Sequence, residues 1–217
     1  MRLPRQEISD AASETGWRLI LGELRTWVRC PSLAAAASLA ERVAARVDAG
    51  DHLRMDVRAD GLYLSLTTPA ESFVTARDLD LAQAISAIAG ELGLACQSDA
   101  GDRPVQTVEI AIDALDIPAV MPFWQAVLEY TPDGTDALLD PAGQGPSVWF
   151  QQMDAPRPQR NRVHFDVVVP HDEAKRRMDA ALAAGGRVTY DAEAPAFWVL
   201  ADPEGNEACI CTWQGRD

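Results

Sequence analysis

The chain has 217 residues, 47% of them hydrophobic, which is enough for one large domain or for two small domains with compact cores. Its 33 acidic and 19 basic residues give a formal net charge of −14, which argues against nucleic acid and against anionic membranes as partners. The N-terminal stretch lacks the apolar core of a secretory signal, and no run of about 18 apolar residues could span a membrane. We therefore expect a cytoplasmic protein whose cysteines are reduced.

The first 97 residues predict an α+β sandwich, an antiparallel sheet with its helices on one face. The expected elements are a helix over 5–14, strands over 17–21 and 24–30, a helix over 32–48, strands over 52–58 and 62–68, and a helix over 75–92. Thr75 begins the last helix, with Asp78 in the capping-box position. The order is therefore α-β-β-α-β-β-α.

The stretch from Ser98 to Pro104, SDAGDRP, has the composition of a linker. We expect it to separate a first domain, residues 1–97, from a second domain, residues 105–217.

The second half predicts a βαβββ unit that occurs twice, at about residues 105–152 and 162–213. The expected elements are strands over 105–113, 137–140 and 147–152 with a helix over 117–130, then strands over 162–169, 187–190, 197–201 and 208–213 with a helix over 173–184. Identity between the two copies is slight, so the repeat is one of pattern.

A histidine and a carboxylate mark the strand expected between Arg160 and Pro170. Its alternation places Val163, Phe165, Val167 and Val169 on one apolar face. His164, Asp166 and Val168 fall on the other face. Because a purely structural strand would carry Thr or Ser at such positions, this strand is the first candidate to carry chemistry in the second half.

Three motifs of the second half resemble the vicinal oxygen chelate superfamily, the glyoxalase and bleomycin-resistance fold. The stretch Asp116–Leu128 resembles the family's "D…FW…LG" helix, with Glu129 in place of the usual glycine. NRVHFD, ending at Asp166, resembles its "NRVHLD" strand, and ADPEGNEAC, ending at Cys209, matches its closing "DPEGNEFC". The resemblance implies that the two βαβββ units form a cup.

In that family, metal ligands project from four strands into the cup. By position they fall here on Glu109, Gln151 (or its neighbour Gln152), His164 and Cys209. The resemblance implies a divalent ion (zinc, nickel, iron or manganese) that acts as a Lewis acid on a substrate's paired oxygens. The mixed hard and soft ligand set suits zinc better than a hard ion.

Two interpretations of the cup remain open. It holds a metal, or it is a metal-free cup whose polar walls bind an organic ligand. Trp149 shares the parity of Gln151 and is either a stacking platform for a planar ligand or a structural filler. Asp166 is either a partner that orients His164 or a solvated acid.

The first half resembles the pterin-4a-carbinolamine dehydratase family. Gly16-Trp17 matches the Gly-Trp motif at the start of the family's sequence, and Val74–Ala82 matches its "LTxxDxxLA" motif. The ungapped match back from Asp78 sets Asp51-His52-Leu53 on the family's "HHP" and Thr68-Pro69 on its "TH".

Dehydration of a carbinolamine needs an acid for the leaving hydroxyl and a base for the N–H proton, and the family supplies both from its histidines. This chain keeps His52 and has Asp51 and Pro69 at the other two positions. His52 with Asp51 is therefore either a weak acid/base pair or part of a degenerate scaffold.

Two classes of function follow. The first is a glyoxalase-like protein that binds a small organic ligand in the second-half cup, as a binding module or as a metal-assisted lyase or isomerase. The second is a hydro-lyase of the 4a-hydroxytetrahydrobiopterin dehydratase type centred on His52. The expected partners are a small molecule and a second copy of the chain.

Overall fold

The computed structural model describes residues 3–97, 99–100, 103–105, 107–156, 164–169, 172–212 and 214. The chain divides into two compact units, Met1–Thr107 and Val108–Asp217. Each has a hydrophobic core of its own.

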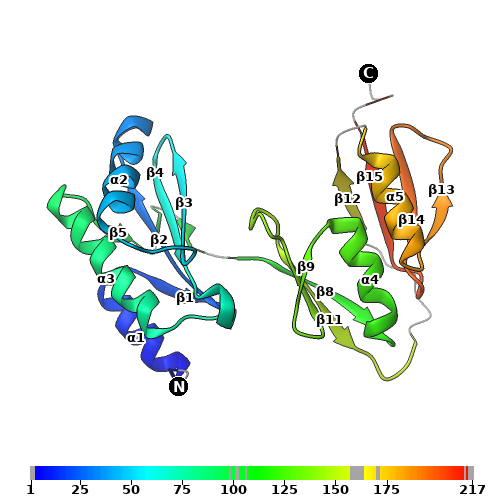
Figure 1. Ribbon diagram of the computed structural model, residues 1–217, viewed down its shortest axis with the longest axis horizontal. Coiled ribbons are helices and arrows are strands. Elements are labelled where there is room, and N and C mark those ends of the chain that lie inside the picture. The colour runs from blue at the N-terminus through cyan, green and yellow to red at the C-terminus, as the bar shows by residue number, and fades with distance from the viewer. Residues whose placement is uncertain are drawn as a thin grey trace. The chain divides into compact units, whose positions relative to one another are not determined.

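The first unit is a five-stranded antiparallel sheet covered by three helices (Figure 1). Its elements are α1 (Arg5–Glu14), β1 (Arg18–Ile20), β2 (Glu23–Arg29), α2 (Leu33–Arg46), β3 (Leu53–Arg58), β4 (Gly61–Leu66), the short 3₁₀ helix η1 (Pro69–Glu71), α3 (Ala76–Glu91) and β5 (Cys96–Gln97). The sheet order is β1-β2-β4-β3, and β5 pairs with β2. The expected α-β-β-α-β-β-α sandwich is confirmed. The sequence missed β5, whose two residues are too few to show a period.

Alternation along the two central strands builds the core of this unit. Leu62, Leu64 and Leu66 of β4 are buried on the helix-covered face. Leu24 and Val28 of β2 lie in the same core. Since successive strand side chains point to opposite faces, the intervening residues lie on the other face.

The second unit contains two βαβββ modules, as expected. The first module consists of β8 (Glu109–Ala114), α4 (Ile117–Leu128), β9 (Thr131–Asp133), β10 (Ala137–Leu139) and β11 (Ser147–Gln152). The second consists of β12 (Phe165–Val168), α5 (Ala174–Ala183), β13 (Arg187–Tyr190), β14 (Phe197–Ala201) and β15 (Glu207–Cys211). The sheet orders are β8-β11-β10-β9 and β12-β15-β14-β13, and α4 packs against α5 (Figure 1).

Three strands of this unit differ from the expectation. Strand β8 begins at Glu109 and not at residue 105. The unexpected strand β9 contains Pro132, which argues against a strand by sequence but is tolerated because β9 is at the sheet edge. Strand β12 begins at Phe165, so His164 immediately precedes it. The expected start of that strand, residues 160–163, lies outside the described residues.

The buried carboxylate of Asp202 connects the two modules. Its Oδ2 accepts the indole N–H of Trp124, on α4, at 3.0 Å and the side-chain amide of Asn206 at 2.8 Å. Its Oδ1 accepts the backbone N–H groups of Glu204 and Asn206 at 2.9 and 2.8 Å. Asp202 is fully buried, so these four donors replace the water that a carboxylate would otherwise bind.

Glu129 occupies the position of the glycine that ends the family's "D…FW…LG" helix. It ends α4 with φ +57°, the left-handed conformation that glycine adopts freely and other residues adopt at a cost of about 1 kcal/mol. Its carboxylate forms ion pairs with Arg176 and Arg177 of α5. These ion pairs hold the end of α4 against α5, a role that a glycine could not perform.

None of the helices in the described part of the chain is both long enough and apolar enough to cross a bilayer.

Limited proteolysis checks the expected domain boundary, which stays a prediction. Part of the expected linker forms β6 (Asp99–Ala100) and β7 (Arg103–Pro104), a short antiparallel pair. We expect subtilisin to cut first within 98–104 and to leave two fragments that unfold separately, because each unit has its own core. A first cut inside either unit, or a single cooperative unfolding transition, would contradict this boundary.

Asp202→Ala tests the connection between the modules. Removing the acceptor leaves the buried indole N–H of Trp124 and the donors of Asn206 without partners, so we expect a loss of about 3 kcal/mol in the free energy of unfolding. Urea denaturation followed by tryptophan fluorescence measures it. The exposed Asp191→Ala is the matched control and should change stability by less than about 0.5 kcal/mol. Equal effects of the two substitutions would refute the role of Asp202.

Candidate functional site

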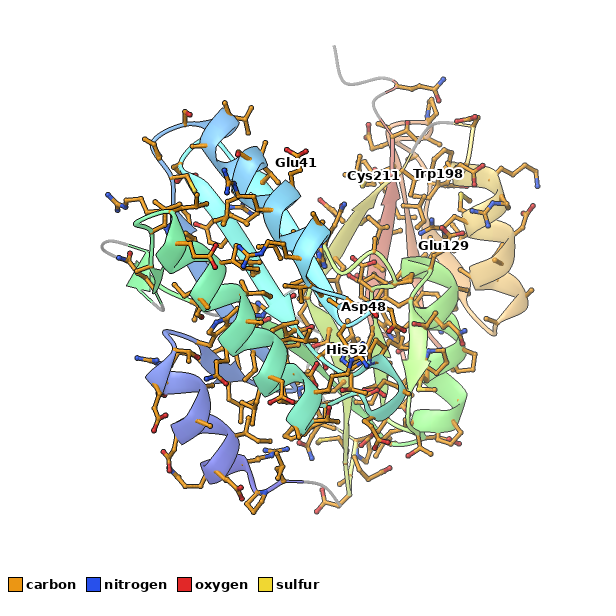
Figure 2. All side chains as sticks on the ribbon, turned by 60° about the vertical axis from the view of Figure 1, so that its left-hand side comes forward. Glu41, Asp48, His52, Glu129, Trp198 and Cys211 are labelled. Atoms are coloured by element: carbon orange, nitrogen blue, oxygen red, sulfur yellow. The ribbon has the colours of Figure 1, made fainter. Side chains whose placement is uncertain are left out.

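The second sheet of the C-terminal unit has one face packed on the core and one open face. Trp198 and Ile210 belong to the core face, toward α5, while Cys211 lies on the opposite face (Figure 2). In the parallel pair of β12 and β15, Asp166 stands opposite Cys209, and Val168 opposite Cys211. Because facing residues of paired strands share a sheet face, all four lie on the open face.

Three potential metal ligands converge on this open face. The ligand atoms of His164, Asp166 and Cys209 all lie within 4.8 Å of one another, which makes them a candidate cation site among the described residues. His164 Nε2 is 3.4 Å from Asp166 Oδ1, and both side chains are more than half exposed. Cys209, in contrast, is only 6% exposed, so it lies at the base of the cluster.

The cluster changes the acid–base chemistry of Cys209. Burial, and then the hydrogen bond and negative charge of Asp166, raise the pKa of the Cys209 thiol to about 12. The thiol is therefore protonated at neutral pH, and a cation bound beside it would favour the thiolate.

Apolar side chains adjoin the cluster on the same face. Phe197 and Val199 of β14 stand opposite Cys211 and Cys209. The rings of Phe197 and Tyr190 are stacked, with centroids 6.0 Å apart and an interplanar angle of 21°. Val168, the last residue of the edge strand β12, is 70% exposed and stands opposite Cys211, which in turn stands opposite Phe197. We refer to Val168, Phe197, Tyr190 and Val199 as the apolar floor.

The first sheet places the other expected ligands on its own open face. Val148 and Phe150 of β11 are buried, so Trp149 and Gln151 point away from the core. Trp149 stands between two small residues, Ala111 and Ala137, and is half-buried.

Glu109 and the glutamines make their contacts within the first module. Glu109 is exposed, and its Oε1 accepts the Ser147 hydroxyl at 3.0 Å. The Gln151 amide contacts only the neighbouring Gln152 carbonyl, at 3.4 Å, among the bonds of the described chain. Gln152 donates to the Leu115 carbonyl at 2.8 Å, which gives this alternative ligand a structural role.

The structure thus brings together His164 and Cys209, which the resemblance names as ligands, and adds Asp166 to them. Glu109 lies outside this cluster. An imidazole, a carboxylate and a thiol are donors that suit zinc and similar ions, so these three side chains fit a divalent metal by their chemistry.

A second group of polar residues surrounds the fully buried carboxylate of Asp78 in the first unit. Its Oδ2 accepts the Thr75 backbone N–H and the Thr68 hydroxyl, each at 2.7 Å. Its Oδ1 lies 2.8 Å from Nδ1 of His52, whose side chain is 14% exposed. The contact favours the tautomer with the proton on Nδ1, so that Nε2 carries the lone pair.

The carboxylate that contacts His52 (labelled in Figure 2) therefore comes from α3. Asp51, the expected partner, is exposed next to it in the sequence. Thr68 contributes its hydroxyl to the Asp78 network, whereas the adjacent Pro69 begins η1.

Sequence reasoning missed two features of these sites. The sequence indicates Asp78 only as part of the cap of α3, a role that the structure confirms. Its match to the aspartate of the "LTxxDxxLA" motif was the signal of a further role at the site. The stacked Tyr190 and Phe197 were also missed, although each lies in an expected strand.

Comparisons with known proteins agree with this division of the chain. Residues 109–211 match the family model described as glyoxalase-like domain, and residues 1–88 match the model described as pterin 4 alpha carbinolamine dehydratase. No curated protein matches the chain.

Solved structures resemble each half separately. A glyoxalase-related enzyme from Fulvimarina pelagi is 19% identical over 50% of this chain and 88% of its own, with a TM-score of 0.40. A fosfomycin resistance protein from Listeria monocytogenes is 14% identical over 48% and 88%, with a TM-score of 0.37. A transcriptional coactivator/pterin dehydratase from Brucella melitensis is 22% identical over 41% and 98%, also with a TM-score of 0.37. Likenesses of this degree concern the fold and carry no inference about activity.

Proposed function

Since the chain joins a pterin carbinolamine dehydratase-like domain to a glyoxalase-like domain, we propose that it binds a small organic ligand on the open face of the second sheet of the glyoxalase-like domain. The observation that carries the proposal is the exposed apolar floor. Val168, 70% exposed at the end of β12, lies on the same sheet face as the stacked rings of Phe197 and Tyr190, with β15 between them. Exposed apolar surface of this kind typically marks a binding site.

The surface favours a flat ligand that is neutral or positively charged. Aromatic side chains that stack with one another present flat faces on which a planar molecule packs well. Residues 108–217 carry 18 acidic and 8 basic side chains, so most of the chain's negative charge belongs to this domain. Asp166 adds a carboxylate at the edge of the floor, and such a field disfavours anions.

A divalent metal and lyase or isomerase chemistry are the finer part of the proposal. A bound metal would supply Lewis-acid chemistry at the substrate's oxygens. With a metal bound, His164 and Asp166 would be ligands of the ion; in a metal-free cup, His164 would take or return a proton at the ligand's polar end, and Asp166 would orient its imidazole. Of the originally expected ligands, Glu109 and Gln151 would then line the cup. The cytoplasmic location and the homodimer expected from the sequence stay predictions.

A binding screen tests the proposed function. We expect at least one member of a panel of planar heteroaromatic amines and α-hydroxycarbonyl compounds to bind with micromolar affinity by calorimetry. Val168→Lys should weaken that binding at least about tenfold, because it places a charge on the apolar floor. Leu33→Lys, at an exposed leucine of the first unit, is the control and should not change the affinity. Equal affinities of the two variants would exclude the floor as the site.

A second candidate function, carbinolamine dehydration, is supported by the contact between His52 and Asp78. A buried carboxylate at Nδ1 orients the imidazole, and Nε2 would take the N–H proton or protonate the leaving hydroxyl. One histidine would have to perform both tasks in turn, since Asp51 and Pro69 occupy the other two positions of the family's motifs.

Turnover of a 4a-hydroxytetrahydropterin, followed by absorbance, tests this candidate. We expect slow dehydration above the uncatalysed rate, its loss in His52→Ala, and a fall in kcat of at least about tenfold in Asp78→Asn. The exposed Asp80→Asn, on the same helix, is the control and should keep the rate. Thermal unfolding of each variant separates a catalytic loss from a folding defect. A rate that survives in His52→Ala would refute the role of this histidine.

A further inference from the structure

We propose that His164, Asp166 and Cys209 form a thiolate-containing site for one zinc-class ion, Zn²⁺ or Co²⁺, instead of the four-residue site that the resemblance implies. The inference rests on the proposed function, whose ligand surface adjoins this cluster, and specifies which side chains hold the ion and which ions they select.

The spacing of the three side chains matches one coordination sphere. Two ligand atoms bound to the same tetrahedral zinc lie about 3.3–3.7 Å apart, given Zn–N, Zn–O and Zn–S bonds of about 2.0–2.3 Å. His164 Nε2 and Asp166 Oδ1 are already 3.4 Å apart. The Cys209 sulfur lies within 4.8 Å of both ligand atoms, so side-chain rotation suffices to close the sphere.

The backbone holds two of these ligands in place. Asp166 and Cys209 face each other across the parallel pair of β12 and β15. His164, two residues before Asp166, falls on the same face. Ligands on paired strands are more precisely positioned than ligands on loops.

The burial of the ligands fits an open metal site. Cys209 lies at the base, 6% exposed, while the side chains of His164 and Asp166 are 58% and 57% exposed. An ion held by these three ligands would keep a fourth position toward solvent and the apolar floor, the arrangement typical of catalytic zinc.

The donor set selects the ion. A thiolate and an imidazole favour zinc and cobalt, whereas Mg²⁺ and Ca²⁺ require oxygen ligands. Together the carboxylate and the thiolate neutralise a divalent cation. Glu109, the carboxylate ligand implied by the resemblance, instead accepts a hydrogen bond from the Ser147 hydroxyl. The competing explanation is that His164 and Asp166 form an ordinary exposed ion pair, which contributes little.

Titration of the full metal-free chain with Co²⁺ tests the proposal. We expect one Co²⁺ per chain, with a near-ultraviolet absorption band that arises from thiolate-to-cobalt charge transfer. Cys209→Ser should abolish the band. His164→Ala and Asp166→Ala should each weaken Co²⁺ binding at least about tenfold. Even the loss of a residue that only hydrogen-bonds to a metal ligand typically weakens metal binding by about that factor. Zn²⁺ should displace Co²⁺, and millimolar Mg²⁺ should not.

Three control variants distinguish this site from its alternatives. Cys211→Ser removes the other thiol on the same face of β15, and the band should remain. Glu109→Gln and Gln151→Ala should leave the Co²⁺ affinity unchanged within about twofold, whereas the four-residue site predicts a loss of at least about tenfold. Absence of the band, its persistence in Cys209→Ser, or a tenfold loss in Glu109→Gln would each overturn the proposal.

The result is independent of the ligand screen. Co²⁺ binding without any organic ligand would support the metal site and count against the proposed function. Binding of an organic ligand to a protein that shows no cobalt band would do the reverse.

Discussion

A carboxylate is stable inside a protein only when hydrogen-bond donors replace its lost water, and each half of this chain is arranged around one such group. Asp202 requires Trp124 from the first module and Asn206 from the turn of the second, so satisfying it holds α4 against the β14–β15 hairpin. Asp78 requires the start of its own helix, Thr68 after β4 and His52 before β3. In both units, therefore, a single buried acid connects segments that are distant in the sequence. This physical role accounts for the family motifs around these residues, since removing one donor would leave the buried carboxylate short of a hydrogen bond.

In the first unit, the same constraint positions the candidate site. The donors around Asp78 form a rigid support for the His52 imidazole, and a histidine held this way needs no reorganisation before proton transfer. In the glyoxalase-like domain the support is the parallel strand pair, which sets Asp166 against Cys209. The open face that results combines polar donors with an apolar floor, and this combination suits a small ligand with one polar end.

Much of the architecture could be predicted, because long amphipathic helices and alternating strands carry strong periodic signals. Short elements could not: β5 has two residues, and β9 contains a proline that only its edge position permits. Glu129 shows a different limit. The sequence marks it as a departure from a glycine motif, but only the packing of α5 brings Arg176 and Arg177 to its carboxylate.

The sequence by itself determined which residues face the core and which face away, because alternation along a strand is a local property of the backbone. It therefore identified His164, Asp166 and Cys209 as side chains of interest, and His52 as the remaining histidine of its motif. Only the tertiary structure decided which of these side chains meet. The pairing of β12 with β15 and the packing of α3 beside His52 join segments far apart in the chain, and such register depends on the whole core. For that reason Asp78 took the place of Asp51 beside the histidine, and Asp166 joined the cluster that Glu109 had been expected to complete.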